Sequence, residues 1–281
     1  MKVGFMTFEQ FHSKKDIASS RIRAKWLTKY WPEAEEYLLG QKYDVLVFQK
    51  VYYPDYARMC KSIKILDVCD GDFLDWGCRM KETIDEMDAV VTSTQALADV
   101  ISTMTDKPVV VIPDRMDLEF HTQKKVHEGQ ARSVVWFGYS QNQKALETAI
   151  PSLIKLGLNL IVISDKPFPL PINFMGKIQV TNYPWSIKTV NDDIIKGDMV
   201  VNPQYSTGHW KYKSPNKTLT AWALGMPVAD TPEDLVKFMD PEERIKEANK
   251  RLEEVKTQHD VRLSVAEYKA LCERLMSARS V

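Results

Sequence analysis

Short runs of valine, isoleucine and other apolar residues alternate along this chain with stretches of helical pattern, and this alternation restricts the fold more than any other feature. Strands that are apolar on both faces indicate parallel sheets covered by helices on both sides. The strands expected in the first half are residues 2–8, 44–48, 63–68, 89–92 and 109–112. Those expected in the second half are residues 133–137, 159–163, 178–180, 197–203 and 226–229. The predicted fold class is α/β, with two doubly wound parallel-sheet (Rossmann-like) domains.

The alternation is interrupted once by a polar segment and then restarts, which suggests where the domains divide. We expect an N-terminal domain over residues 1–120, a linker over 121–132 and a second domain over 133–240. Residues 241–281 read as C-terminal helices that could pack back on the first domain. A chain of 281 residues is long enough for two such cores.

Helical patterns fall between the strands, at residues 20–31, 76–87, 95–104, 143–156, 186–196, 214–224 and 241–259. Two further segments, Thr231–Asp234 and Ser264–Glu267, match the capping box that marks a helix start. We therefore expect Thr231 and Ser264 to be N-cap residues.

Charge and cysteine usage exclude several classes of protein. Lys+Arg and Asp+Glu both number 38, so the net charge is zero, which argues against a nucleic-acid partner. No apolar run approaches the roughly 18–20 residues of a membrane span, and no signal-peptide pattern opens the chain. A cytoplasmic protein without a transmembrane segment is predicted, with peripheral membrane contact left open. The four cysteines form no CxxC pair, and no histidine pair has metal-binding spacing, so no metal site is predicted.

The segment from Lys211 to Val228 reads as a helix with both ends marked. Ser214 suits the N-cap and Pro215 the first helical position, while Gly225 supplies the stop. Around this start stand Lys213, Asn216 and Lys217. Cations in a first turn oppose the helix dipole, but a bound phosphate or diphosphate would make them favourable. An anion site is therefore predicted here, unless both lysines are merely solvated.

Three other loops follow the carboxyl ends of expected strands, where ligands bind in open parallel sheets. The first offers Ser20, Arg21 and Arg23 at a helix start, and arginine forks suit phosphate or carboxylate. The second contains Asp70 and Asp72. The third offers a flexible glycine, a hydroxyl and a cation in Gly138, Ser140 and Lys144.

Each of these loops has a plainer interpretation. The two aspartates could cap a helix or close a turn, or could hold a divalent metal with a nucleotide diphosphate. The arginines could form weak surface salt bridges. Trp185 could stack on a nucleobase or simply pack in the core. Neither the G-x-G-x-x-G fingerprint nor the phosphate loop G-x-x-x-x-G-K-[ST] occurs.

Taken together, these features resemble a GT-B glycosyltransferase, and within that fold the retaining family 4 enzymes. The resemblance rests on the paired domains and on three segments: Val111–Asp117, Trp136–Ser140 and Lys213–Val228. Val111–Asp117 is similar to that family's "VIPNGVD" linker, and Ala221–Val228 to its "EAMACGTPV" ending. The resemblance covers nearly the whole chain.

The resemblance implies two domains facing a central cleft, with a nucleotide-sugar donor on the second and a hydroxyl acceptor on the first. By position, the residues implied at the donor are Gly138, Ser140, Lys144, Trp185, Lys213, Ser214, Asn216 and Lys217. Asp70, Asp72 and Lys213 would act at the reacting centre, and Ser20, Arg21 and Arg23 would bind the diphosphate or an anionic acceptor. The family needs no cofactor and usually no metal.

One departure from that family concerns its two glutamates, which contact donor sugar and ribose. They fall at Tyr212 and Thr220 here, and neither residue is acidic. The resemblance predicts transfer of a sugar from a nucleoside-diphosphate donor to a hydroxyl acceptor. A non-catalytic nucleotide-sugar-binding protein of the same fold is the alternative, and a Rossmann-type oxidoreductase or epimerase is a more distant one.

Overall fold

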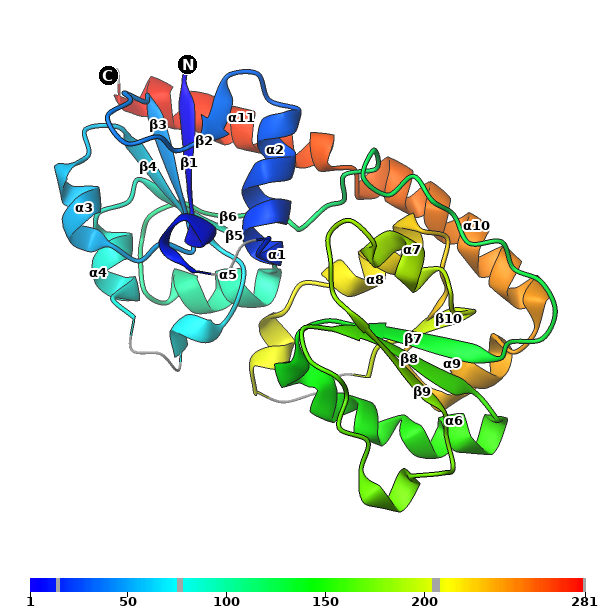
Figure 1. Ribbon diagram of the computed structural model, residues 1–281. Helices are drawn as coiled ribbons and strands as arrows, with labels where there is room; N and C mark the ends of the chain where they lie inside the picture. Colours follow the sequence, from blue (N-terminus) through cyan, green and yellow to red (C-terminus); the bar gives the residue numbers. More distant parts are fainter. Residues whose placement is uncertain (14–15, 75–77, 204–207, 280–281) are drawn as a thin grey trace. The chain divides into compact units, whose positions relative to one another are not determined.

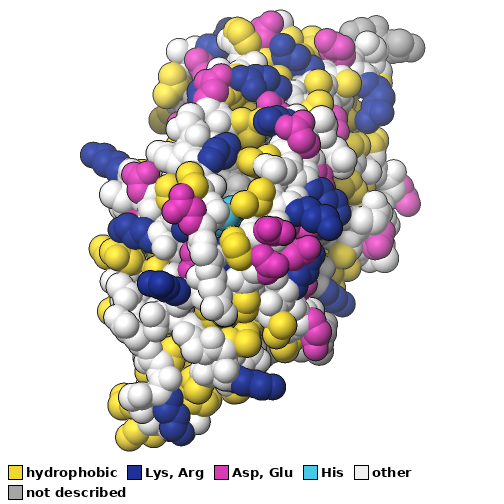
Figure 2. Space-filling view, turned by 90° about the vertical axis from the view of Figure 1, so that its right-hand side faces the viewer, with side chains coloured by type: hydrophobic (Ala, Val, Ile, Leu, Met, Phe, Trp, Pro, Cys, Tyr) yellow, Lys and Arg dark blue, Asp and Glu magenta, His cyan; other side chains and the backbone are white. Residues whose placement is uncertain are grey.

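The computed structural model describes residues 1–13, 16–74, 78–203 and 208–279, and the chain divides into two units (Figure 1). Unit 1 contains Met1–Asp117, Thr207–Ser214 and Asp260–Val281. Unit 2 contains Leu118–Ser206 and Pro215–His259. Each unit is built on a parallel sheet of its own, as the alternating pattern predicts. On the face shown in Figure 2, acidic and basic side chains are interspersed.

Unit 1 has a six-stranded parallel sheet in the order β2-β1-β3-β4-β5-β6. Its strands are β1 Val3–Thr7, β2 Ala34–Glu36, β3 Val45–Gln49, β4 Ile63–Val68, β5 Ala89–Thr92 and β6 Val109–Val111. Five of them confirm the predicted strands. The edge strand β2 was not expected, because its three residues include two glutamates and carry no apolar run.

Helices cover both faces of this sheet (Figure 1). One face carries α1 Ala18–Ser20, a π-helical segment Arg21–Lys25, α2 Trp26–Lys29 and α11 Val261–Arg279. The other carries α3 Pro54–Met59, α4 Met80–Asp85 and α5 Gln95–Ser102. Short 3-10 turns lie at Phe8–Phe11, Asp72–Leu74 and Gly208–Tyr212. The helix expected over 20–31 is present and contains a π-helical segment. The first two residues of the helix expected over 76–87 lie outside the described residues, and α4 covers Met80–Asp85 of it.

Unit 2 has a five-stranded parallel sheet in the order β11-β10-β7-β8-β9. Its strands are β7 Ser133–Phe137, β8 Asn159–Ser164, β9 Val180–Pro184, β10 Met199–Val201 and β11 Val228–Ala229. Its helices are α6 Ile150–Leu156, α7 Val190–Ile194, α8 Asn216–Ala223, α9 Pro232–Lys237 and α10 Pro241–Gln258, with 3-10 segments at Ser140–Thr148 and Ile172–Phe174. The strand expected at 178–180 lies further along the chain, in β9.

Two helices of unit 2 differ from their predicted form. The helix expected over 143–156 is a 3-10 segment followed by α6, because Pro151 lacks an N–H and suits only the first turn of a helix. The helix expected over 186–196 is reduced to the five residues of α7. The two units also divide the C-terminal helices, since α10 belongs to unit 2 and α11 to unit 1.

The two capping-box predictions have different outcomes. Thr231 caps α9 with the reciprocal bonds of the motif, as predicted. Ser264 is not an N-cap, because α11 begins earlier, at Val261, after Asp260 accepts a hydrogen bond from the N–H of Arg262. The Ser264 hydroxyl instead accepts a bond from Arg115. None of the described helices combines the length and apolar character that crossing a bilayer requires.

Candidate functional site

At the carboxyl edge of the unit 2 sheet, Gly138 and Lys217 lie against each other although they are far apart in the sequence. The chain leaves β7 at Gly138, whose φ is +150°. The Lys217 side chain, from the first turn of α8, lies against this backbone and over the Trp136 ring, with 4.6 Å from Nζ to the ring centroid. A Cβ on Gly138 would meet Lys217 Cε at 2.8 Å and Nζ at 2.9 Å. Glycine is therefore what allows this lysine to lie at the strand end.

The helix start itself differs from its predicted form. α8 begins at Asn216 with Pro215 as its N-cap, and the Pro215 carbonyl accepts the bond from the N–H of Leu219. Ser214 is not the cap, because its hydroxyl donates to the Asp114 carboxylate within unit 1. Gly225 ends the helix in a left-handed conformation, with φ +71°, as expected.

The third predicted loop also lies at this edge of unit 2. Ser140 donates from its N–H and its hydroxyl to the two oxygens of Asp165, at 2.8 and 3.2 Å. Burial raises the pKa of Asp165, but these bonds outweigh it and lower the pKa overall. Lys144 is exposed, and Trp185 is half-buried against the apolar cluster beneath the sheet. Ser140 is thus hydrogen-bonded to Asp165, a residue that the sequence did not indicate as part of this loop.

Unit 1 carries a second charged group at the carboxyl edge of its own sheet. The Lys50 ammonium, directly after β3, lies 2.8 Å from Asp70 Oδ2 and 2.7 Å from Asp72 Oδ2. The aspartates therefore pair with a lysine rather than close a turn alone. Lys50 was missed from the sequence, although its place after an apolar strand could have indicated it. Among the described residues, no group of His, Cys, Asp or Glu is arranged to hold a metal ion.

Lys213 lies in unit 1 and Lys217 in unit 2, so the two predicted cations belong to different units. The Lys213 Nζ lies over the Trp210 ring, 4.2 Å from its centroid. Burial lowers the pKa of Lys213, and the charge of Asp70 opposes that change. Lys213 is therefore electrostatically associated with Asp70.

The arginine loop contains one residue that the structure removes from the candidate site. Arg23 is only 3% exposed and donates to Asp67 and Asp114, so the prediction that it binds a ligand anion is wrong. Ser20 is also buried, and its hydroxyl donates to Gln49 at 2.9 Å. Arg21 is half-buried and donates to the Asp16 carbonyl at 3.0 Å. Of the three, only Arg21 reaches the surface of this helix.

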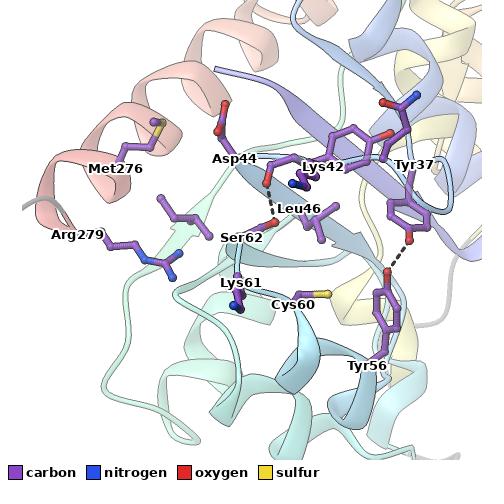
Figure 3. Close-up of a pocket in the computed structure, with 13 residues that line it drawn as sticks. Tyr37, Lys42, Asp44, Leu46, Tyr56, Cys60, Lys61, Ser62, Met276 and Arg279 are labelled. Carbon is purple, nitrogen blue, oxygen red and sulfur yellow. Dashed lines mark hydrogen bonds between the residues drawn. The ribbon is translucent and has the colours of Figure 1, made fainter.

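One cavity of unit 1 lies elsewhere. Its volume is about 610 Å³, and its walls include Tyr37, Tyr56, Lys61 and Arg279 (Figure 3). The residues that precede β3 and β4 line it, so it opens at the amino ends of these strands. Because ligands of open parallel sheets bind at carboxyl ends, the loops at the carboxyl end of each unit's own sheet are better candidates for ligand binding than this cavity.

Comparison with protein-family models finds no match, and neither does comparison with curated proteins. Among solved structures, the chain is similar to HepE of Anabaena in complex with UDP and glucose, with a TM-score of 0.73 at 10% identity, covering 98% of this chain and 100% of that one. The DNA-modifying β-glucosyltransferase, solved with and without uridine diphosphoglucose, has a TM-score of 0.53 at 13% identity, covering 99% and 98%.

The GtfA/B complex has a TM-score of 0.55 at 10% identity, and the match covers 82% of this chain. The chain spans little more than half, 57%, of that protein. At such identities the similarities establish the fold, which is GT-B: two units, each with a parallel sheet between helices.

Proposed function

We propose that this protein is a glycosyltransferase that moves a sugar from a nucleoside-diphosphate donor to a hydroxyl acceptor, retaining the anomeric configuration and needing no metal. The observation that carries the proposal is the placement of Lys217 in unit 2. Its ammonium lies at the carboxyl edge of the sheet, beside the glycine that ends β7 and at the start of α8. The names of two similar structures, which include UDP or uridine diphosphoglucose, favour a UDP-sugar donor.

The chemistry suits a cation in this position. Breaking the anomeric bond leaves negative charge on the departing diphosphate, and a preorganised ammonium stabilises that charge in the transition state. The N–H groups of the first turn of α8 add to the attraction, with Asn216 among the residues of that turn. Gly138 and Lys144 contribute a closely approaching backbone and a second cation, and Trp185 offers a ring for the base.

On the acceptor side, Asp70 is proposed to orient the acceptor hydroxyl or take its proton, with Asp72 and Lys213 beside it. The family's paired glutamates have no acidic replacement here. Tyr212 is buried, and the Thr220 hydroxyl donates to the Asn216 carbonyl at 2.8 Å. This loss favours the second candidate, a nucleotide-sugar-binding protein without transfer activity.

A thermal-shift screen against UDP, GDP, ADP and their glucose conjugates tests the proposal. A ligand that binds the folded state alone at 100 times its Kd adds about 2.7 kcal/mol of stability, so one nucleotide should raise Tm clearly above the others. Release of free diphosphate from the selected donor then separates the transferase from the binder. If no nucleotide raises Tm above that of the protein alone, both the transferase and the nucleotide-sugar-binding protein are contradicted.

Replacing Gly138 with alanine should weaken binding of that nucleotide, because the new methyl group would displace Lys217. We expect about a tenfold loss of affinity, which corresponds to about 1.4 kcal/mol. Gly157→Ala is the matched control, since its φ is +66° but nothing lies within 4 Å of the added Cβ. Calorimetric titration should show weaker binding in the first variant only, and equal affinities would contradict the placement of Lys217 at the donor.

A further inference from the structure

Lys50 adopts a backbone conformation that is uncommon for a residue other than glycine. It lies directly after β3 with φ +55°, in the left-handed region that few non-glycine residues occupy. Its N–H donates to the Asp67 carbonyl at 2.9 Å. A backbone of this kind is destabilising, and such residues cluster at functional sites. The conformation directs the Lys50 side chain toward the loop that follows β4.

Lys50 is also a buried cation, with a side chain only 9% exposed. Its ammonium bonds both aspartates and lies 5.2 Å from the centroid of the Phe8 ring. Burial disfavours the charged form, but the two carboxylates outweigh it and raise the pKa of Lys50 above its ordinary value. The lysine therefore stays charged and holds both carboxylates at once.

The two carboxylates differ in what else they contact. The Asp72 side chain is 12% exposed, and its Oδ1 has no hydrogen-bond partner among the groups that the structure describes. The Asp70 side chain is 39% exposed. Asp72 thus fixes the lysine from inside the protein, while Asp70 presents a carboxylate that a ligand can reach.

We propose that Lys50 is a positioning residue, which holds Asp70 in the orientation that accepts a hydrogen bond from the acceptor hydroxyl. This rests on the proposed glycosyl transfer and deepens it, because it names the residue that orients Asp70. Lys50 does not contact the acceptor. It acts through Asp70, and Asp72 keeps the ammonium in place.

The test compares Lys50→Met and Lys50→Arg with the unchanged protein, using UDP-glucose as donor and p-nitrophenyl β-glucoside as acceptor. A misplaced reacting group reduces rates by about 100-fold, so kcat/KM for the acceptor should fall by about that factor in Lys50→Met. Lys50→Arg should recover part of it. The Tm increase given by UDP should be the same in all three proteins, because Gly138, Trp185 and Lys217 of the proposed donor site belong to unit 2 and Lys50 belongs to unit 1.

A double variant strengthens the test. In Asp70→Asn, adding Lys50→Met should cause no further loss, because the two changes remove one interaction. Unchanged acceptor kinetics in Lys50→Met, or an equal loss of UDP binding, would overturn the proposal for Lys50 and leave the glycosyltransferase function standing. If the unchanged protein transfers no sugar to p-nitrophenyl β-glucoside, transfer to this acceptor fails, and the crystal structure of Lys50→Met decides the positioning role. A displaced Asp70 carboxylate supports it, and an unmoved one refutes it.

Discussion

Replacing Lys217 with alanine is expected to reduce sugar transfer by about 100- to 1,000-fold, the loss typical of removing one preorganised group that stabilises developing negative charge. The methylene stem of Lys217 fits against Gly138, and its ammonium lies over the Trp136 ring, so the charge is fixed before the donor arrives. Alanine removes the charge and leaves the helix intact, since alanine is the best helix former. Initial rates with the donor chosen by the thermal-shift screen measure the effect.

A charge elsewhere in the same unit serves as the control. Lys250 is exposed on α10, and Lys250→Ala should keep full activity. Lys217→Arg retains the charge but must fit a larger group beside Gly138, and we expect an activity between those of Lys217→Ala and the unchanged protein. Normal turnover in Lys217→Ala, with normal UDP affinity, would remove the main support for the proposed donor site.

Replacing Arg23 with methionine is expected to lower the free energy of unfolding by about 3–5 kcal/mol, the usual effect of removing one partner of a buried ion pair. Its guanidinium donates to Asp67 at 2.8 and 3.0 Å, to Asp114 at 2.9 Å and to the Ile112 carbonyl at 2.8 Å. Without it, two buried carboxylates would lose their cation. Burial already raises the pKa of Asp67, and Arg23 opposes that change.

Urea unfolding followed by tryptophan fluorescence measures this loss. Arg21→Met, two residues away on the same helical segment, is the matched control and should change stability by less than about 1 kcal/mol, as expected for a partly exposed charge. Equal effects of the two substitutions would contradict a structural role specific to Arg23.

Much of the architecture could be predicted from local pattern. Strands such as β3 and β4 are apolar on both faces, and that property alone indicates a sheet covered by helices on both sides. The end of α8 at Gly225 and the cap at Thr231 were also predictable, because each depends on residues within one turn of the helix. The fold class followed from repeating these local features along the chain.

Local pattern could not identify side-chain partners that are distant in sequence. Ser214 looks like an N-cap until Asp114, 100 residues earlier, accepts its hydroxyl. Lys50 seemed unremarkable because its partner Asp70 lies 20 residues further along the chain. Neither pairing leaves a periodic trace in the sequence, since a hydrogen bond needs only two groups and its partner can lie on any element.

Arg21 and Arg23 show most clearly the difference between what the sequence determines and what the tertiary structure decides. The sequence by itself determined that both lie on a helix after the first strand, because hydrophobic spacing sets which residues become helical. Only the tertiary structure decided that Arg23 is buried among Asp67, Asp114 and Tyr268, which are 44, 91 and 245 positions away. Burial depends on what packs against a side chain, and that is established only when strands and helices from the whole unit come together.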